Sequence, residues 1–167
     1  AGLGNYGTFI GELFVNHDLN DTDYVGGMFR HHSSQGGIKE VLLDDKFYDT
    51  SLDLMYGSNR KNVSWNLDLG LQNQIYNWYG LPTDFGNGLA PQNRVQLINS
   101  IDPRQSYNRV SLGGNIAFDE SILNKMSLKF SHFKDIFNSA ENRFYIKPTL
   151  QFDVMDSAVK TDIIVDY

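Results

Sequence analysis

The chain has 167 residues, no cysteine, and 20 acidic against 14 basic side chains, for a formal net charge of −6. This length suits one domain or part of one, so residues 1–167 are treated as a single unit. An acidic chain lacks the basic surface that a nucleic-acid partner requires. The absence of cysteine excludes disulfides and thiolate metal sites. No run of apolar residues exceeds three, which excludes a transmembrane helix.

Apolar residues recur at every second position along the chain, which is the period of a β-strand. The predicted strands span, in chain order, residues 5–18, 24–36, 47–57, 62–79, 106–119, 125–137, 142–155 and 158–167. Two details are irregular: Ile10 and Phe14 break the alternation of the first strand, and Pro148 interrupts the seventh. Most of these segments exceed the usual strand of about five or six residues. They approach the ~9–11 residues with which a tilted strand crosses a bilayer.

The connections between these strands alternate in length. Four are short, at residues 20–22, 58–61, 120–125 and 156–157, whereas the intervening ones include residues 36–46 and 80–105. Outer-membrane barrels have short turns at the periplasmic rim and longer loops at the extracellular rim. With eight strands, both ends of the segment fall at the long-loop rim. This predicts an internal piece of a larger barrel, or else a strand count that is off by one.

The two faces of these strands differ in character. One is apolar; the other is rich in Ser, Asn, Gln, Gly and Asp, and aromatic residues gather near strand ends, as in the aromatic girdles of membrane barrels. We therefore expect an all-β fold, an antiparallel up-and-down transmembrane β-barrel with about eight strands in this chain, as part of a larger barrel. The predicted lumen-facing polar residues are Glu12, Arg30, Asp53, Asp68, Gln72, Arg109, Lys129, Lys147, Asp153 and Lys160.

Short links also predict strand register. The link at residues 20–22 places Glu12 opposite Arg30 and Leu13 opposite Phe29, and the link at 156–157 places Asp153 opposite Lys160. Opposite charges across an antiparallel pair contribute roughly 0.2–1 kcal/mol each. For the remaining carboxylates, the expected partners are basic residues of the same face: Asp49, Asp53 and Asp68 with Arg109, Lys129 or Lys147.

Three segments resemble a known family. Gly2–Thr8 (GLGNYGT) followed by Glu12–Asn16 (ELFVN) resembles a strand start in Bacteroidota outer-membrane barrels of the TonB-dependent-receptor type. Gly26–Gly36 (GGMFRHHSSQG) resembles a strand end of the same family, and Asn77–Gly80 (NWYG) resembles its aromatic strand top. The resemblance extends from Gly2 to about Pro82. It implies a bacterial outer-membrane location and a barrel of many more strands, with uptake energised through an N-terminal plug as a further implication.

Chemical motifs are weak in this sequence. His31 and His32 are strand neighbours that point to opposite faces, so they do not form a joint metal site. The acidic loop with Glu40, Asp44 and Asp45 lacks calcium-binding spacing. We expect no catalytic residues, metal or cofactor. The predicted extracellular recognition residues, at the long connection, are Trp78, Tyr79, Phe85 and Asn87.

Three functions remain open from sequence. The first is an outer-membrane barrel, TonB-dependent-receptor-like or porin-like, that takes part in solute uptake. The second is a structural barrel subunit of an outer-membrane secretion or assembly complex. The third is a soluble eight-stranded ligand-binding barrel. The first two predict outer-membrane lipid as a partner, and other outer-membrane complex subunits or a lipoprotein as further partners. None of the three involves nucleic acid.

Overall fold

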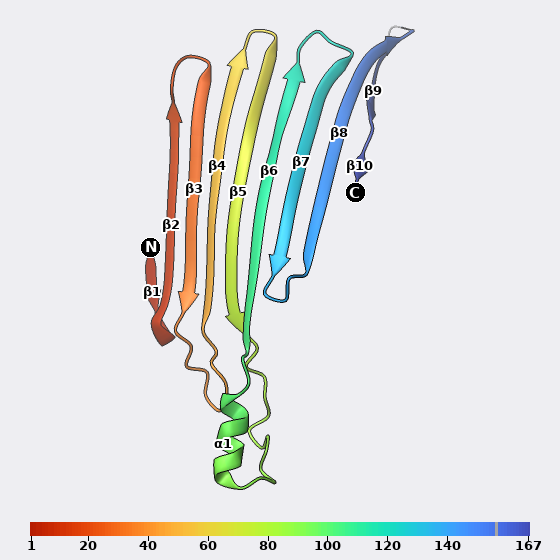
Figure 1. The fold of residues 1–167 in the computed structure, drawn as a ribbon. Helices are drawn as coiled ribbons and strands as arrows, with labels where there is room; N and C mark the ends of the chain where they lie inside the picture. The colour runs from red at the N-terminus through yellow and green to blue at the C-terminus, as the bar shows by residue number, and fades with distance from the viewer. Residues whose placement is uncertain (156) are drawn as a thin grey trace.

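A single antiparallel β-sheet makes up most of the molecule in the computed structural model, which describes residues 1–155 and 157–167. Figure 1 shows the strands side by side in one layer. The elements are β1 (Gly2–Gly4), the 3-10 turn η1 (Asn5–Gly7), β2 (Thr8–Asp18), β3 (Asp23–Ser34), β4 (Phe47–Arg60), β5 (Val63–Asn77), α1 (Pro91–Asn99), β6 (Arg104–Phe118), β7 (Leu123–Asp135), β8 (Ala140–Val154), β9 (Ser157–Asp162) and β10 (Val165–Asp166). Within the described residues, no helix is long and apolar enough to span a membrane.

The topology is up-and-down, because each strand from β1 to β8 pairs with the next one along the chain, and β9 and β10 both pair with β8. This confirms the all-β, antiparallel part of the prediction. The sheet is open rather than closed, and it contains ten strands rather than eight. The two chain ends lie alongside the sheet, away from its rims (Figure 1).

The structure has two strands more than predicted, because the first and the last predicted strands are each divided in two, and each division has a local cause. At the first predicted strand, Tyr6 (φ 62°) and Gly7 (φ 61°) adopt left-handed conformations, so the chain turns at η1 and separates β1 from β2. At the last one, Ile163 lies opposite Pro148 and donates its N–H to the Pro148 carbonyl (3.1 Å). Proline has no N–H to return the bond. The ladder is therefore interrupted, and the predicted strand 158–167 divides into β9 and β10.

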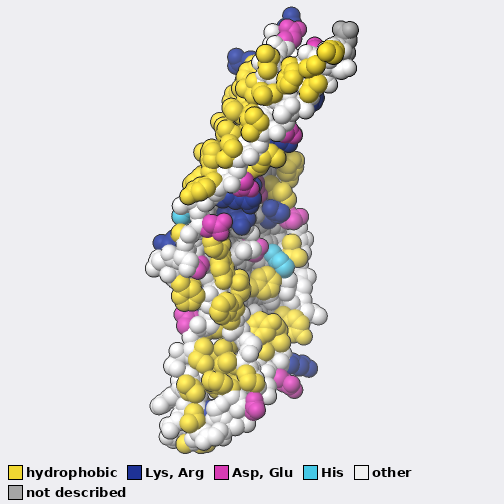
Figure 2. Space-filling view, turned by 90° about the vertical axis from the view of Figure 1, so that its right-hand side faces the viewer, with side chains coloured by type: hydrophobic (Ala, Val, Ile, Leu, Met, Phe, Trp, Pro, Cys, Tyr) yellow, Lys and Arg dark blue, Asp and Glu magenta, His cyan; other side chains and the backbone are white. Residues whose placement is uncertain are grey.

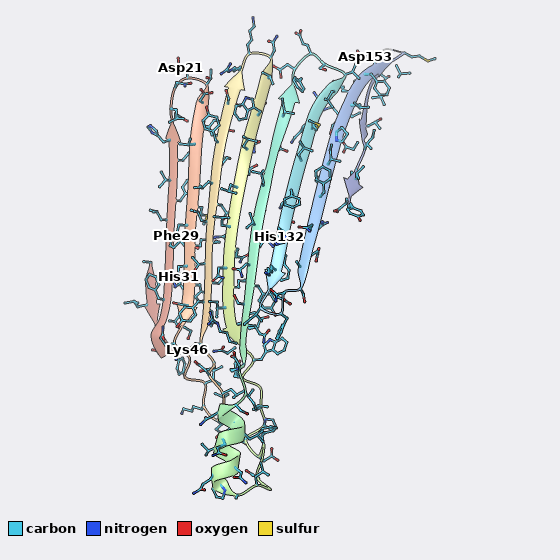
Figure 3. All side chains as sticks on the ribbon, in the orientation of Figure 1. Asp21, Phe29, His31, Lys46, His132 and Asp153 are labelled. Carbon is cyan, nitrogen blue, oxygen red and sulfur yellow. The ribbon has the colours of Figure 1, made fainter. Side chains whose placement is uncertain are left out.

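The alternation of connection length is confirmed. The links β2–β3, β4–β5, β6–β7 and β8–β9 lie at one rim, at the top of Figure 1. The longer segments 35–46 and 78–103 lie at the opposite rim, where α1 forms inside the second of them. Asp21 and Asp153 mark the short-turn rim and Lys46 the loop rim in Figure 3.

One predicted register is correct and one is wrong. Glu12 lies opposite Arg30 and Leu13 opposite Phe29, as the short link required. Asp153, however, lies opposite Ala158, and Lys160 lies opposite Gln151. The cause is that β8 already ends at Val154, which pairs with Ser157. A shift of two residues keeps every side chain on its expected face, but it removes the predicted Asp153–Lys160 pair.

The apolar face carries no covering layer. Among the described residues no hydrophobic side chain is buried, and Leu13, Leu67 and Leu112 are 61%, 54% and 55% exposed. On β8 this face is apolar from Phe144 to Val154, which is about 34 Å along the strand. When the sheet is seen from its edge, hydrophobic side chains gather over its upper part, above a group of basic side chains (Figure 2).

A row of polar side chains, the polar border, crosses the apolar face near the loop rim, with Phe9, Tyr48 and Ile75 beyond it. His31 Nδ1 and Thr50 Oγ1 are 2.8 Å apart, and Asn73 donates to Asn108 over 2.7 Å. A third pair, His132 with Asn142, is 2.7 Å apart. His31 and His132 both lie toward the lower end of the strands in Figure 3. The apolar side chains thus form a band of limited height.

The loop rim is held by a junction that depends on glycine. Gly36 (φ 83°) and Gly37 (φ 117°) both have left-handed backbone conformations, which side chains disfavour. A Cβ at Gly36 would overlap the Asp45 carboxylate. By contrast, a Cβ at Gly80 would have no heavy atom within 4 Å, and Gly80 has no positive φ.

We expect Gly36→Ala to lower the free energy of unfolding by about 1–3 kcal/mol, because it adds backbone strain and a clash with Asp45. Gly80→Ala, the matched control, should cause no loss. Denaturant titration of both variants measures this. Equal stability of the two variants would contradict the proposed role of the junction.

Candidate functional site: the polar face of the sheet

The polar face gathers all of the predicted lumen-facing residues. Strand register places Glu12, Arg30, Gln72 and Arg109 in one cross-strand row, interrupted only by Ser51 on β4. The same pairing puts the others on this face: Asp53, Asp68, Lys129, Lys147, Asp153 and Lys160. That they share one face follows from the structure, whereas the role of that face as a lumen is still a prediction.

The predicted ion-pair partners of the acidic residues are wrong. Asp53 accepts a hydrogen bond from Arg30 Nη2 at 3.4 Å, not from Arg109 or Lys129. The Asp49 carboxylate accepts from the amides of Gln72 (3.1 Å) and Gln74 (3.0 Å). Side-chain length and strand register decide these partners. Each carboxylate bonds to a donor on an adjacent strand, which lies nearer to it than a basic side chain several strands away.

Lys147 finds its partner on the last strands instead. Its Nζ lies 2.7 Å from Asp162 Oδ2, and Asp162 also accepts from Thr149 Oγ1 at 2.6 Å. Arg143 donates to Asp166 through two nitrogens, at 2.8 and 2.5 Å. These pairs fix β9 and β10 against β8, which compensates for the ladder interrupted at Pro148.

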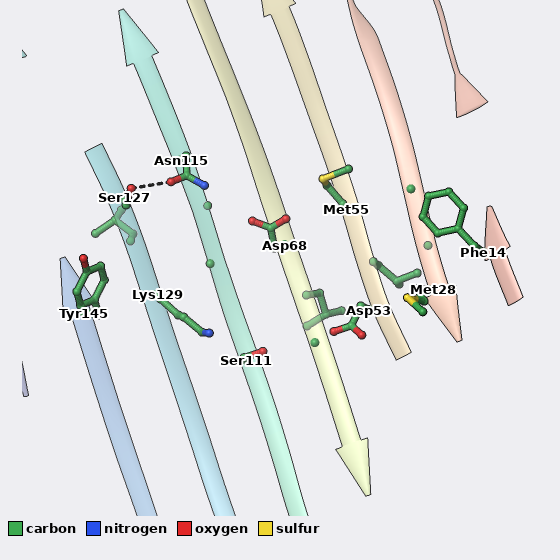
Figure 4. Close-up of a pocket in the computed structure, with 18 residues that line it drawn as sticks. Phe14, Met28, Asp53, Met55, Asp68, Ser111, Asn115, Ser127, Lys129 and Tyr145 are labelled. Atoms are coloured by element: carbon green, nitrogen blue, oxygen red, sulfur yellow. Dashed lines mark hydrogen bonds between the residues drawn. The ribbon is translucent and has the colours of Figure 1, made fainter. Parts of the chain in front are cut away.

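An ordered chain of hydrogen bonds crosses the centre of the polar face. Ser127 Oγ donates to Asn115 Oδ1 (2.6 Å), and Asn115 Nδ2 donates to Asn66 Oδ1 (3.2 Å). Asn66 Nδ2 in turn donates to Asp68 Oδ2 (2.6 Å). Asp68, predicted to pair with a base, is therefore satisfied by an amide. Figure 4 shows the Ser127–Asn115 bond.

Two broad hollows lie on this polar face. One, of about 530 Å³, extends from Phe14 on β2 to Tyr145 on β8. The other, of about 670 Å³, extends from Arg30 on β3 to Tyr145. Residues from so many strands border a common space only when the sheet curves around it, so the polar face is concave. The floor is made of small residues, including Gly70, where a Cβ would lie 2.5 Å from Ser111 Oγ.

Two features of this face were missed by sequence reasoning. Tyr107 stacks between Tyr76 (ring centroids 5.3 Å apart) and Phe133 (5.6 Å), although its place near a strand end suggests an aromatic girdle. Phe14, Met28 and Met55 line the first hollow as an apolar wall. Alternation alone could have placed each of these residues on the polar face. To predict which of them contact one another, the register between strands of separate hairpins must also be known.

The predicted recognition residues lie at the loop rim, but they do not form one cluster. Trp78 is 60% and Tyr79 37% exposed. Phe85 contributes its carbonyl, which accepts from Arg94 Nε at 2.8 Å, and the Asn87 N–H donates to Asp84 O at 3.0 Å. Arg94 is the residue that orders this connection, since its Nη2 also donates to Thr83 O at 2.7 Å.

The histidine pair behaves as the strand geometry predicted. His31 contacts Thr50 on the apolar face, whereas His32 lies on the polar face, edge-on to Phe47 with centroids 4.8 Å apart. No group of three or more metal-binding side chains occurs in residues 1–155 and 157–167. The acidic loop has a structural role instead: Asp45 Oδ2 accepts from the N–H groups of Ile38 (2.7 Å) and Gly37 (2.9 Å).

Comparison of the chain with protein-family models, with curated proteins and with solved structures finds no match. The resemblance to TonB-dependent-receptor barrels therefore stays a prediction.

We expect the Asp45 junction to weaken in acid. The N–H groups of Ile38 and Gly37 hold the pKa of the Asp45 carboxyl below its ordinary value. The stabilisation is therefore present above the ordinary pKa of about 3.9 and is lost as the pH falls through the lowered folded-state value.

The measurement is hydrogen exchange of the Gly37 and Ile38 amides, corrected for intrinsic exchange rates. Protection should decrease in that acidic range, and Asp45→Asn should show low protection at every pH. Equal protection of the variant and the wild type at neutral pH would contradict the assignment.

Proposed function

We propose that this chain forms wall strands of an outer-membrane β-barrel that takes part in solute uptake, with its polar concave face toward an aqueous lumen. The observation that carries the proposal is the direction of curvature. The hollows lie on the polar face, and the apolar face lies outside the curve. A soluble barrel would curve the other way, around its apolar side chains.

The apolar band has dimensions that suit a bilayer. On β5 it extends from Val63 to Leu71, and on β8 from Phe144 to Val154, or about 27 and 34 Å along the strands. At a tilt of ~40° these lengths correspond to roughly 20–26 Å across the membrane, close to the ~25 Å band of outer-membrane barrels. The polar border at His31, Asn73 and His132 ends the band at the loop rim.

Residues that would cluster in a soluble core are spread over this outer face. Leu69, Ile116 and Phe152 belong to three strands, β5, β6 and β8, and Phe152 is 40% exposed. The Trp65 and Tyr56 rings lie beside each other on the same face, tilted by 43° with centroids 5.4 Å apart, where an interfacial aromatic pair is expected. These features support the membrane barrel over a soluble binding barrel.

Tryptophan fluorescence tests the lipid contact directly, because the chain has two tryptophans. In Trp78→Phe, the remaining Trp65 lies on the apolar band. In Trp65→Phe, the remaining Trp78 lies beyond the polar border. We expect acyl-chain-brominated phospholipid to quench Trp65 strongly and Trp78 much less. Equal weak quenching of both would overturn the proposal.

A charge on the apolar band should be costly, whereas the same charge on the polar face should not. We expect Leu67→Arg to reduce the stability of the lipid-folded chain by about 2–4 kcal/mol. Gln74→Arg is the matched control, since it adds an equal charge on the polar face of the same strand, directly opposite Asp49. Denaturant titration in lipid vesicles measures both. If Leu67→Arg costs no more than Gln74→Arg, the apolar face does not contact lipid.

A further inference from the structure

The two hollows of the polar face form one continuous space. Asp53, Gly70, Ser111, Lys129 and Tyr145 line both of them. The space therefore has two ends along the strands, one toward the short-turn rim and the other toward the loop rim. A single small molecule could contact both ends at once.

The end toward the loop rim carries an excess of positive charge. The 670 Å³ hollow is lined by four basic residues, Arg30, Arg109, Lys129 and Arg143, against two acidic ones, Asp53 and Glu141. The chain as a whole has a net charge of −6, so this local excess is against the overall balance. A concave surface of one sign of charge concentrates ions of the opposite sign.

Two of these bases are available to a ligand. Asp53 engages Arg30, and Asp166 engages Arg143. Across the part of the chain that the structure describes, neither Arg109 nor Lys129 forms an ion pair. In Figure 4 the Lys129 amine extends over the floor toward Ser111.

Hydroxyl groups lie between these bases. Ser111 is directly opposite Ser131, which is directly opposite Arg143. Neither serine hydroxyl makes a hydrogen bond within the described residues. Two free hydroxyl donors beside two unpaired cations are groups that hydrogen-bond to a carboxylate or a phosphate.

The end toward the short-turn rim has an apolar wall on its β2–β4 side, with the Asp68 carboxylate on the neighbouring strand. Phe14, Met28 and Met55 line it, and Phe14 is 69% and Met55 36% exposed. Phe14 is also one of the residues that break the alternation of β2. Met55 on β4 and Lys129 on β7 are three strands apart, about 14 Å between backbones. Both line the same hollow, and an extended eight-carbon chain is similar in length to this separation between backbones.

We propose that the joined hollows bind a small organic anion. Its carboxylate or phosphate group contacts Arg109, Lys129 and the Ser111 hydroxyl, and its apolar part lies against Met55 and Met28. This inference deepens the proposed function and rests on it, because it names the class of solute that the lumen face receives.

The test uses octanoate as the probe, with acetate and octylammonium as comparison ligands. Calorimetric titration is done on the full chain in lipid nanodiscs, with empty discs subtracted. We expect octanoate to bind more tightly than either comparison ligand. Lys129→Gln and Arg109→Gln should each weaken octanoate binding about 1.4- to fivefold, the range for exposed charge pairs. Met55→Ser should weaken octanoate and leave acetate unchanged.

Lys125→Gln is the matched control, because it removes a positive charge from the same face outside both hollows. Octylammonium binding as tightly as octanoate, or equal losses in Lys125→Gln and Lys129→Gln, would overturn the inference. Trp65 quenching in the same discs separates the two proposals. Quenching without octanoate binding rejects the anion site alone, and octanoate binding without quenching rejects the membrane barrel alone.

Discussion

One constraint dominates this molecule: a single-layer sheet has an apolar face and no second layer to cover it. In water each Å² of apolar surface left exposed forgoes about 25 cal/mol, and soluble domains avoid this loss by packing two layers together. Here Leu67 and Leu112, in the middle of the sheet, are more than half exposed. In the membrane barrel proposed above, hydrocarbon on the outer side would take the place of a second layer. That proposal accounts together for the long strands, the polar inner face and the limited height of the apolar band.

Period-two alternation made much of this fold predictable. It places the strands, and the short link at residues 20–22 sets the register that puts Leu13 opposite Phe29 and Glu12 opposite Arg30. The prediction failed where backbone chemistry overrides side-chain pattern. Pro148 lacks the N–H that its partner strand needs, so β9 and β10 separate. The link after Val154 has the predicted two residues but begins one position earlier, which shifts the pairing by two, and alternation has no information about a shift of two residues.

Side-chain partners were less predictable than strands. Charge type suggested bases for Asp49 and Asp68, but the nearest donors are the amides of Gln72, Gln74 and Asn66. The Tyr76–Tyr107–Phe133 stack depends on the register of β5 against β6, which are joined by the long segment 78–103. A short turn fixes register through its geometry, whereas a long connection leaves it to the strands themselves. The local helix α1 and its Arg94 contacts lie in that same segment.

The neighbouring glycines of β6 connect the fold to its proposed use. Gly113 and Gly114 are adjacent, so each serves a different face. On the apolar face a Cβ at Gly114 would overlap the Asn66 carbonyl, so β5 and β6 can approach closely there. On the polar face Gly113 leaves space below Lys129, whose Cγ would lie 3.7 Å from an added Cβ. Glycine weakens a strand interior and favours bending. The same two residues thus permit the sheet to curve toward its polar face and keep the resulting hollow open.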